Sequence, residues 1–390
     1  MKKKILAFTA IRSEYDLLSG LYKLLNEDKD IEFKIIVSGA HLSKRGGNTV
    51  KDIEQDGLEI LARINTLIDS DTKASRIKSG SQLLNEAIDI VDEYNPDLII
   101  YAGDREEVII ASIIGGYLEI PTIHFFGGDH VQDSHIDNPV RHATSKMSTI
   151  HMVSSDQHAK RLNRMGEDNQ RIFNIGSVAL DKFHNDEIHT FDEIKDYFDI
   201  PSQINNYALL IFHPIPKERK YSAEIFENIL LTLKEKNIFT FVSHPNIDPG
   251  SSEIISVINK FKNMSDFNFY KSQPRKIFLS IYKNADFIIG NSSSGIIESA
   301  SIPIPAINVG YRQTGRTANN NVIFCDTTSR QSISDAIETS KSEKFQMIVK
   351  KTNNIYGDGK SIDKAFKIIK ENTFNELLFK DEDILEMSHE

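Results

Sequence analysis

Short apolar runs recur along this chain, and longer stretches with apolar residues at helical spacing separate them. The runs lack the strict alternation of a sheet that has one face in water. They are typical of parallel strands whose two faces are both covered by helices. In the first half we expect such strands at residues 4–10, 33–39, 97–104, 122–128, 149–155 and 171–177. The first half therefore predicts a doubly wound α/β domain.

The same pattern restarts after a polar, acidic segment at about 181–201. Crossover helices are expected at 217–236 and 274–283, and a further helix at the end of the chain. The strands of this half are expected at residues 207–214, 239–245, 286–295, 304–310 and 321–326. The sequence thus predicts two α/β domains, at 1–185 and 186–361, with a cleft between them.

The composition is that of an ordinary globular protein, with 39% hydrophobic and 26% charged residues among 390. Lys and Arg number 46 against 56 Asp and Glu, and no basic run concentrates positive charge, so nucleic acid is not an expected partner. Cys325 is the single cysteine, which excludes an intrachain disulfide and favours a reducing compartment, the cytoplasm. We expect a first strand rather than a signal peptide, and no membrane helix.

Ligands of open parallel sheets bind beyond the carboxyl ends of the strands, where helix N-termini point at them. One expected strand ends there in a turn of small residues, GNSSSGIIESA at 290–300. Its hydroxyl and amide donors suit a phosphate, whereas the competing interpretation is a plain helix cap. Glu298, one turn further, can accept hydrogen bonds from sugar hydroxyls. The candidate phosphate ligands are Ser292, Ser293, Ser294 and Gly295.

Four arginines also lie directly after expected strands. Arg312 and Arg316 follow a strand of the second half, and Arg12 and Arg105 follow two strands of the first. Guanidinium groups bind phosphate oxygens through paired hydrogen bonds. We therefore expect these arginines to converge on an anionic ligand, and the alternative is that each is a solvated surface charge.

The segment at 124–146 is the densest in ionisable side chains and holds four of the twelve histidines. Asp129, Asp133 and Asp137 lie in it, and Asp104 ends the strand before it. Carboxylates that crowd together in a partly dry site repel one another, which raises some of their pKa values and makes them usable acids or bases. The segment therefore predicts a proton-transfer site.

Two other interpretations of this segment stay open. His130 and His135, with Asp129 and Asp137, could ligate a metal ion, although their spacing matches no zinc pattern. The plain alternative is a long polar loop in which these residues stabilise turns.

Two further histidines, His213 and His244, each precede a proline at the end of an expected strand. An imidazole at that place can donate a hydrogen bond to a phosphate or protonate a leaving group near neutral pH. The competing interpretation is that both histidines are structural.

These segments, in this order, resemble the UDP-N-acetylglucosamine 2-epimerase family, and in particular its hydrolysing branch, which feeds the synthesis of sialic-acid-like nonulosonates. The resemblance covers nearly the whole chain. The motifs that carry it are the Arg12 loop, HLSKRGGNT, AGDREE, the GGD…D…RHATSK block, FNIGSVALD, FHP, HPNIDPGS, GNSSSGIIES and INVGYRQTGR.

The resemblance implies a GT-B fold, in which two facing Rossmann-like domains bind a nucleotide mainly through the second. A terminal helix, here at about 362–390, returns to the first domain. The implied nucleotide ligands are Ser292 and Ser293 for the diphosphate, Glu298 for the ribose, Asn246 beside them, and Arg12, Arg105 and Arg312 around the phosphates. The residues that match the family's catalytic positions are Asp104, Asp129, Asp137 and His213.

In the implied reaction, a carboxylate removes the hydrogen on sugar carbon 2 while nucleoside diphosphate leaves carbon 1. The resulting glycal is hydrated with inverted configuration at carbon 2. Because that hydrogen is barely acidic, departure of the diphosphate must be far advanced in the transition state, and stabilisation of the phosphates should matter as much as the base. The resemblance implies a nucleotide-sugar substrate, no metal or cofactor, and a homodimer or homotetramer.

The chain also departs from the family pattern. Asp129 stands where the family usually has Glu, its interval to Asp137 is longer than usual, and the first loop reads AIRSEY. These differences bear on the identity of the sugar and on the division of acid and base roles. The rival functions are a non-hydrolysing epimerase, a GT-B glycosyltransferase, which needs an acceptor, and a nucleotide-sugar sensor without turnover.

Overall fold

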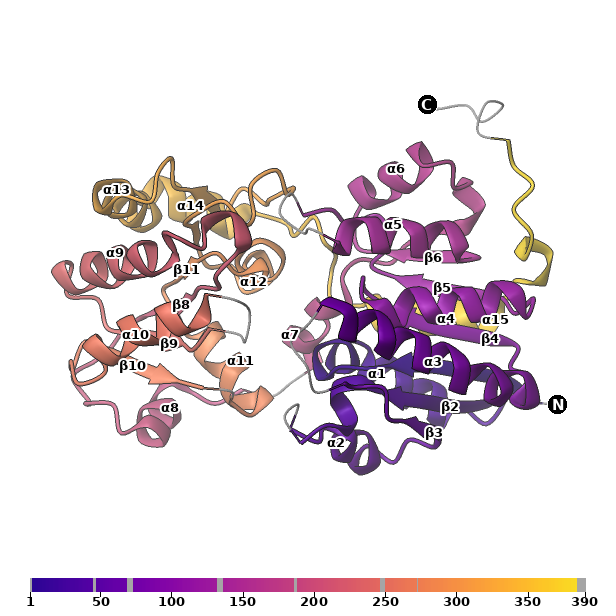
Figure 1. Ribbon diagram of the computed structural model, residues 1–390. Helices are drawn as coiled ribbons and strands as arrows, with labels where there is room; N and C mark the ends of the chain where they lie inside the picture. The colour runs from indigo at the N-terminus through magenta and orange to yellow at the C-terminus, as the bar shows by residue number, and fades with distance from the viewer. Residues whose placement is uncertain are drawn as a thin grey trace. The chain divides into compact units, whose positions relative to one another are not determined.

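The computed structural model describes residues 2–44, 47–68, 73–131, 136–185, 188–245, 250–271 and 273–383. The chain divides into two compact units. Unit 1 combines Met1–His130, Ser134–Asp181 and Gly359–Glu390, and unit 2 contains Lys182–Asp358 with Val131–Asp133. Both units have the predicted doubly wound α/β architecture (Figure 1).

The sheet of unit 1 has seven parallel strands in the order β3-β2-β1-β4-β5-β6-β7. Their bounds are β1 (Lys3–Thr9), β2 (Ile31–Ser38), β3 (Ile60–Ile64), β4 (Leu98–Ala102), β5 (Thr122–Phe125), β6 (Ile150–Val153) and β7 (Ile172–Asn174). Its helices are α1 (Arg12–Glu27), η1 (Gly39–Leu42), α2 (Val50–Gln55), α3 (Lys73–Tyr94), α4 (Glu106–Tyr117), α5 (Asp137–Met147), α6 (Asp156–Arg164), η2 (Asn169–Arg171), η3 (Val178–Leu180), α15 (Ser361–Glu371) and η6 (Asn375–Leu377).

The sheet of unit 2 has six parallel strands in the order β10-β9-β8-β11-β12-β13. They are β8 (Ala208–Ile211), β9 (Thr240–Ser243), β10 (Phe267–Tyr270), β11 (Phe287–Gly290), β12 (Ala306–Asn308) and β13 (Val322–Phe324). The helices of this unit are α7 (Lys182–Asn185), α8 (Phe191–Phe198), η4 (Pro216–Glu218), α9 (Ser222–Glu235), α10 (Ser251–Phe261), α11 (Arg275–Lys283), α12 (Ser293–Ile297), η5 (Ser299–Ser301), α13 (Arg330–Lys341) and α14 (Glu343–Lys351).

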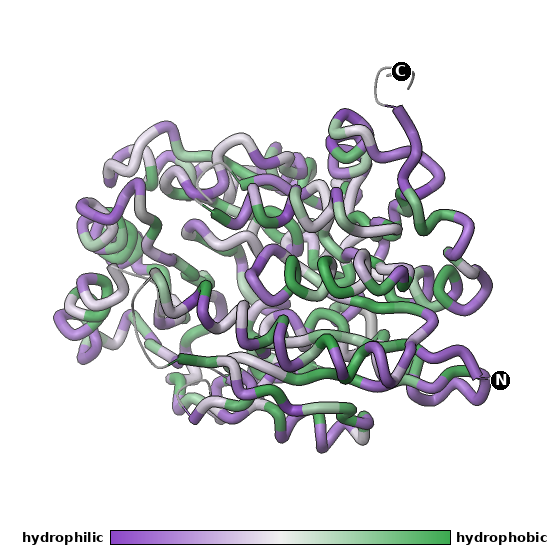
Figure 2. The backbone as a smooth tube through the Cα atoms, turned by 45° about the vertical axis from the view of Figure 1, so that its right-hand side comes forward, coloured by the Kyte–Doolittle hydropathy of each residue, from purple (hydrophilic) through white to green (hydrophobic). Residues whose placement is uncertain are grey.

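Helices cover both faces of each sheet, which explains the continuous apolar runs. In β1, Ile5 and Ala7 pack into one core cluster of unit 1, whereas Leu6 and Phe8 pack into another. Figure 2 shows the hydrophobic stretches of the chain alternating with hydrophilic ones. Within the described part of the chain, no helix combines the length and the apolar character that crossing a membrane requires.

The strand order reverses once in each sheet, between β1 and β4 in unit 1 and between β8 and β11 in unit 2. At such a reversal the helices that follow the two strands lie on opposite faces of the sheet, so the carboxyl ends of the strands stay accessible. The two reversals therefore mark where ligands are expected to bind.

The end of the chain returns to unit 1. Helix α15 packs on α1, and Asp181 accepts hydrogen bonds from the backbone N–H groups of Ser361 (3.1 Å) and Ile362 (2.7 Å) at its start. The helix is shorter than the expected 362–390, because Lys3 Nζ binds the carbonyls of Ile369 and Asn372 and the chain then turns Phe374 into the core.

A buried arginine fixes the segment that follows this helix. The Arg171 guanidinium in η2 donates to the carbonyls of Leu377 and Phe379 (2.9 Å for Phe379), and it binds Glu382 Oε1 at 2.7 Å. Arg171 is 1% exposed, so these contacts form away from water. We call residues 374–383 the terminal segment.

We expect Arg171→Met to release the terminal segment while the rest of unit 1 stays folded. Losing hydrogen bonds from a buried cation weakens the segment by about 3 kcal/mol, so it should open about 10²-fold more often. Lysyl endopeptidase cleavage after Lys380 measures this opening. Lys370→Met, which removes an exposed ion pair with Asp28, is the matched control. Equal cleavage rates for the two variants would contradict the prediction.

Candidate active site

The two predicted arginines of unit 1 lie at its strand reversal, one after β1 and one after β4. Arg12 begins α1 and is exposed, and its Nε lies 3.3 Å from Asp16 and 3.8 Å from Asp52. Arg105 directly precedes α4, and its Nε donates to Glu107 at 3.3 Å. Both guanidinium groups thus have carboxylate neighbours.

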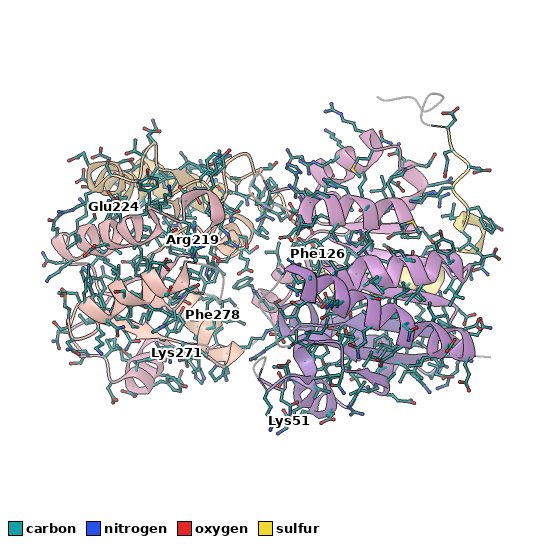
Figure 3. The ribbon with its side chains drawn as sticks, viewed as in Figure 1. Lys51, Phe126, Arg219, Glu224, Lys271 and Phe278 are labelled. Atoms are coloured by element: carbon teal, nitrogen blue, oxygen red, sulfur yellow. The ribbon has the colours of Figure 1, made fainter. Side chains whose placement is uncertain are left out.

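Arg141 in α5 joins two of the predicted catalytic aspartates. Its Nη2 forms an ion pair with Asp104 at the end of β4, and its Nη1 lies 3.5 Å from Asp129. Nη1 also donates to the carbonyl of Phe126 (3.1 Å), which follows β5 at the edge where the strands of this unit end (Figure 3). Arg141 is 7% exposed, so it is a cation held among carboxylates in a partly dry site.

Asp129 is held from several sides. Its Oδ1 lies 3.3 Å from His158 Nε2 and accepts the backbone N–H of His130 at 2.8 Å. The turn before it depends on Gly128, which has a φ of +74°, and a Cβ there would lie 2.3 Å from the carbonyl oxygen of His158. Asp129 therefore lies in a tight turn whose backbone only glycine can provide.

Asp137 is the first residue of α5, one helical turn before Arg141. Burial raises the pKa of its carboxyl, and the negative charge of Asp104 raises that pKa further, whereas the neighbouring arginines lower it. The structure thus brings Asp104, Asp129 and Asp137 together around one arginine. Sequence reasoning did not single out Arg141, although its place one turn after Asp137 in DNPVR was a usable signal.

The histidines of this segment do different things. His124 Nε2 lies 2.8 Å from the carbonyl oxygen of Gly103, next to Asp104, and burial lowers the pKa of His124 to about 3, so it is a neutral structural group. His130 stacks on His142. Asp133 and His135 lie outside the described residues. Among the residues that the structure describes, no three His, Cys, Asp or Glu side chains gather as a metal-binding group.

Two glutamates that the sequence analysis did not consider lie beside Asp104 and Arg105. Burial, followed by the charge of Glu107, raises the pKa of Glu14 in α1 to about 8. The pKa of Glu107 is also raised, mainly by burial. The Oε1 atom of Glu14 is buried and has no hydrogen-bond partner among the described residues. The carboxyl of Glu14 therefore carries a proton at neutral pH.

In unit 2, the predicted phosphate turn connects β11 to α12. Gly290 has a φ of +128°, and a Cβ there would lie 2.1 Å from the carbonyl oxygen of Ile211 in the neighbouring strand β8. Ser292 caps α12, because its Oγ accepts the N–H of Ser294 at 3.3 Å. Ser293, Ser294 and Gly295 form the first turn of the helix. The capping interpretation of Ser292 is thus confirmed, and phosphate binding stays a prediction.

Asn291 ties this turn to His213 and Arg312. Its side chain accepts the N–H of His213 (2.8 Å) and donates to the carbonyl of His213 (2.7 Å). Its own carbonyl accepts hydrogen bonds from Arg312 Nη1 (3.1 Å) and Gln313 Nε2 (3.0 Å). The structure therefore brings together His213, Arg312 and the serine turn, as the strand ends predicted. Sequence reasoning missed Asn291, which has no chemistry of its own that would mark it.

The charge state of His213 differs from the expectation. Burial and the nearby Arg312 lower the pKa of its imidazole to about 4, so His213 is neutral at pH 7 rather than a ready proton donor. Arg316 donates to the Gln313 side chain at 3.0 Å. Asn246 lies outside the described residues, and burial lowers the pKa of His244.

Glu298 lies at the C-terminal end of α12 and is 9% exposed. Its Oε1 accepts a hydrogen bond from Lys182 Nζ at 3.0 Å. Its Oε2 is buried and has no hydrogen-bond partner among the described residues. The predicted ribose ligand therefore has one oxygen in an ion pair and one that can still accept a hydrogen bond.

Known proteins resemble this chain over nearly its whole length. The family model described as UDP-N-acetylglucosamine 2-epimerase matches residues 23–370. The UDP-N,N′-diacetylbacillosamine 2-epimerase (hydrolyzing) of Legionella pneumophila is 32% identical and covers 95% of this chain and 96% of its own. The GDP/UDP-N,N′-diacetylbacillosamine 2-epimerase (hydrolyzing) of Campylobacter jejuni is also 32% identical, over 88% of this chain and 89% of its own.

Solved structures give the same fold. The crystal structure of UDP-GlcNAc 2-epimerase from Neisseria meningitidis bound to UDP-GlcNAc superposes with a TM-score of 0.77 at 15% identity and covers 95% of this chain and all of that one. The expected GT-B-like fold class is thereby confirmed. The motifs, the fold and the match over residues 23–370 agree, and this chain belongs to the UDP-N-acetylglucosamine 2-epimerase family.

Proposed function

We propose that this protein is a hydrolysing 2-epimerase, which converts a UDP-linked N-acetylated amino sugar into the free 2-epimer and UDP. The observation that carries the proposal is the group of three aspartates around Arg141 in unit 1. The names of the two relatives favour UDP-N,N′-diacetylbacillosamine, a 2,4-diacetamido-trideoxyhexose, over UDP-N-acetylglucosamine as the substrate.

In this proposal unit 2 binds the nucleotide. The N–H groups and hydroxyls of the serine turn, together with Arg312, bind the diphosphate, and Glu298 binds the ribose. Asn291 supports this arrangement, because it fixes the turn and Arg312 to the same point. Arg12 and Arg105, whose present partners are carboxylates, and Asn246 complete the proposed nucleotide ligands.

Unit 1 acts on the sugar. Its base takes the hydrogen from carbon 2 as the bond from carbon 1 to the diphosphate oxygen breaks, and the electron pair of the C–H bond forms the C1–C2 double bond of a glycal. Water then adds its hydroxyl to carbon 1, and a carboxylic acid returns a proton to the opposite face of carbon 2. Arg141 forms an ion pair with Asp104 and so fixes the place of that carboxylate, and the raised pKa of Asp137 makes it a better proton acceptor than an ordinary aspartate.

The neutral His213 fits a different part of the reaction. A neutral imidazole can still donate one N–H to the departing diphosphate, next to the Arg312 guanidinium. Stabilisation of the leaving group is then shared between cations and neutral donors, which suits a transition state in which the C1–O bond is largely broken.

Three further proposals rest on the resemblance and the single cysteine. The protein works in the cytoplasm, it forms a homodimer or homotetramer, and its product enters the synthesis of sialic-acid-like nonulosonates.

Incubation with UDP-N,N′-diacetylbacillosamine in D₂O tests the reaction. We expect equal amounts of UDP and free 2-epimer, with one deuterium at carbon 2, because the returning proton comes from solvent. Mass spectrometry and NMR of the products measure this. A product still attached to UDP would show a non-hydrolysing epimerase, and UDP release only after addition of an acceptor would show a glycosyltransferase. Tight binding of UDP- or GDP-amino sugars without turnover would show a sensor.

The variant Asp104→Asn tests the aspartate group. It keeps the size of the side chain but removes the basic carboxylate, so we expect kcat to fall by about 10²–10⁴-fold while the affinity for UDP stays within about threefold. Steady-state kinetics and calorimetry measure the two effects. Asp192→Asn, at an exposed position on α8, is the control and should match the wild type. An Asp104→Asn enzyme with wild-type kcat would remove Asp104 from the reaction.

The proton on Glu14 limits the negative charge beside Arg105. If Glu14, Glu106 and Glu107 were all ionised, three carboxylates would surround this one guanidinium and weaken its attraction for a diphosphate. With Glu14 protonated, Arg105 faces less negative charge at neutral pH.

The same proton makes stability depend on pH. The pKa of Glu14 is about 8 in the folded protein and about 4.5 in an ordinary glutamate, so between these values the folded state holds a proton that the unfolded state lacks. Stability is therefore full below the lower value and falls as the pH rises through the upper one. Glu14→Gln does not titrate, and its stability relative to the wild type should rise by on the order of 3 kcal/mol from pH 5 to pH 8.

Urea unfolding at both pH values measures this difference. Glu224→Gln, at an exposed position in the first turn of α9 (Figure 3), is the matched control and should show no such change. If the stability difference between Glu14→Gln and the wild type were the same at pH 5 and at pH 8, Glu14 would be ionised at both values.

A further inference from the structure

We propose that Lys182 is a positioning residue for nucleotide recognition: it holds one oxygen of Glu298 so that the other accepts a hydrogen bond from a ribose hydroxyl. The inference rests on the proposed function, in which Glu298 binds the ribose of a nucleoside diphosphate. It adds a residue that the family resemblance did not include.

The contact itself divides the roles of the two carboxylate oxygens. Lys182 Nζ lies 3.0 Å from Glu298 Oε1, and the side chains are 18% and 12% exposed. Oε2 of the same carboxylate is buried without a hydrogen-bond partner among the described residues. A buried acceptor without a donor costs free energy, which a ligand hydroxyl can offset. With Oε1 bound to Lys182, Oε2 is the oxygen that still lacks a hydrogen-bond donor in the described part of the chain.

The position of Glu298 is unfavourable for the helix that carries it. A carboxylate at the C-terminal end of α12 faces the negative end of the helix dipole. The Tyr282 hydroxyl donates to the carbonyl of Ser294 at 2.9 Å and the Ser299 hydroxyl donates to the carbonyl of Gly295 at 2.7 Å, so neither proton is shared with Glu298. The ammonium of Lys182 therefore offsets the unfavourable dipole and holds this carboxylate.

Lys182 is well placed to do this because the chain around it is anchored in unit 2. The next residue, Phe183, is 5% exposed and packs edge-on against Tyr282, with ring centroids 5.8 Å apart. The carbonyl of Phe183 accepts a hydrogen bond from Lys283 Nζ at 2.7 Å. Lys182 Nζ lies 5.1 Å from the centre of the Phe183 ring. The ammonium therefore starts from a fixed backbone and rests on an aromatic face, which lowers the entropy lost in the ion pair.

An ion pair with a purely structural role would show the same contacts between Lys182 and Glu298. The test therefore measures how well the protein distinguishes ligands with and without ribose hydroxyls. Calorimetry compares the affinities for UDP and for 2′,3′-dideoxy-UDP, which lacks both ribose hydroxyls. A structural defect lowers the affinity for both ligands by the same factor and leaves the ratio of the two affinities unchanged. Loss of positioning at Glu298 lowers the ratio.

We expect the wild type to prefer UDP about 30-fold, because hydrogen bonds to a charged group are strong. In Lys182→Met the preference should fall to about threefold, and Lys182→Arg should keep most of it. Lys236→Met, which breaks a different ion pair of unit 2 with Glu338, is the matched control and should keep the full preference. Thermal melting checks that each variant is folded, and Lys182→Gln replaces Lys182→Met if the latter does not fold.

A Lys182→Met protein that keeps the wild-type preference would overturn the inference, provided that Glu298→Gln loses it. If Glu298→Gln also keeps the preference, the ribose role of Glu298 is wrong and the inference falls with it. If the wild type binds neither ligand, the proposed function itself fails. The three failures are therefore distinguishable.

Discussion

The reversal of strand order in each parallel sheet is the constraint on which the rest of this structure depends. A parallel strand must be followed by a crossover, and the crossovers on the two sides of β1 and β4, or of β8 and β11, lie on opposite faces. The strand ends between them stay accessible, and a polar side chain placed there does not enter the apolar core. Asp104 of unit 1 and the serine turn of unit 2 directly follow such strands, β4 and β11.

The polar residues beyond the strand ends are connected by a charged side chain in unit 1 and by a neutral one in unit 2. In unit 1 the guanidinium of Arg141 joins Asp104 and Asp129, so the connection is itself charged and it affects the pKa values around it. In unit 2 the amide of Asn291 makes the equivalent connection to His213 without any charge. A charged connection suits a site where protons move, and a neutral one leaves the positive charge of Arg312 available for an anion.

Much of this arrangement could be predicted from the sequence, because strands buried on both faces have continuous apolar runs. The strands β3 and β10 were missed, because a polar residue interrupts each apolar run, Arg63 in ILARI and Asn268 in FNFY. Asp104 and the serine turn directly follow β4 and β11, as expected from the sequence. Arg141 and Asn291 were not found from the sequence, because their contacts depend on how separate segments of the chain fold together. The same holds for Lys182, which lies 116 residues from Glu298 in the chain.

Asp129 is held more closely than Asp104. Its carboxylate is reached by the side chains of Arg141 and His158 and by the N–H of His130, and its side chain is only 11% exposed. The side chain of Asp104 keeps 26% exposure. In the proposed reaction a carboxylate held this closely serves best to fix Arg141, and proton transfer at the sugar then falls to Asp104 and Asp137.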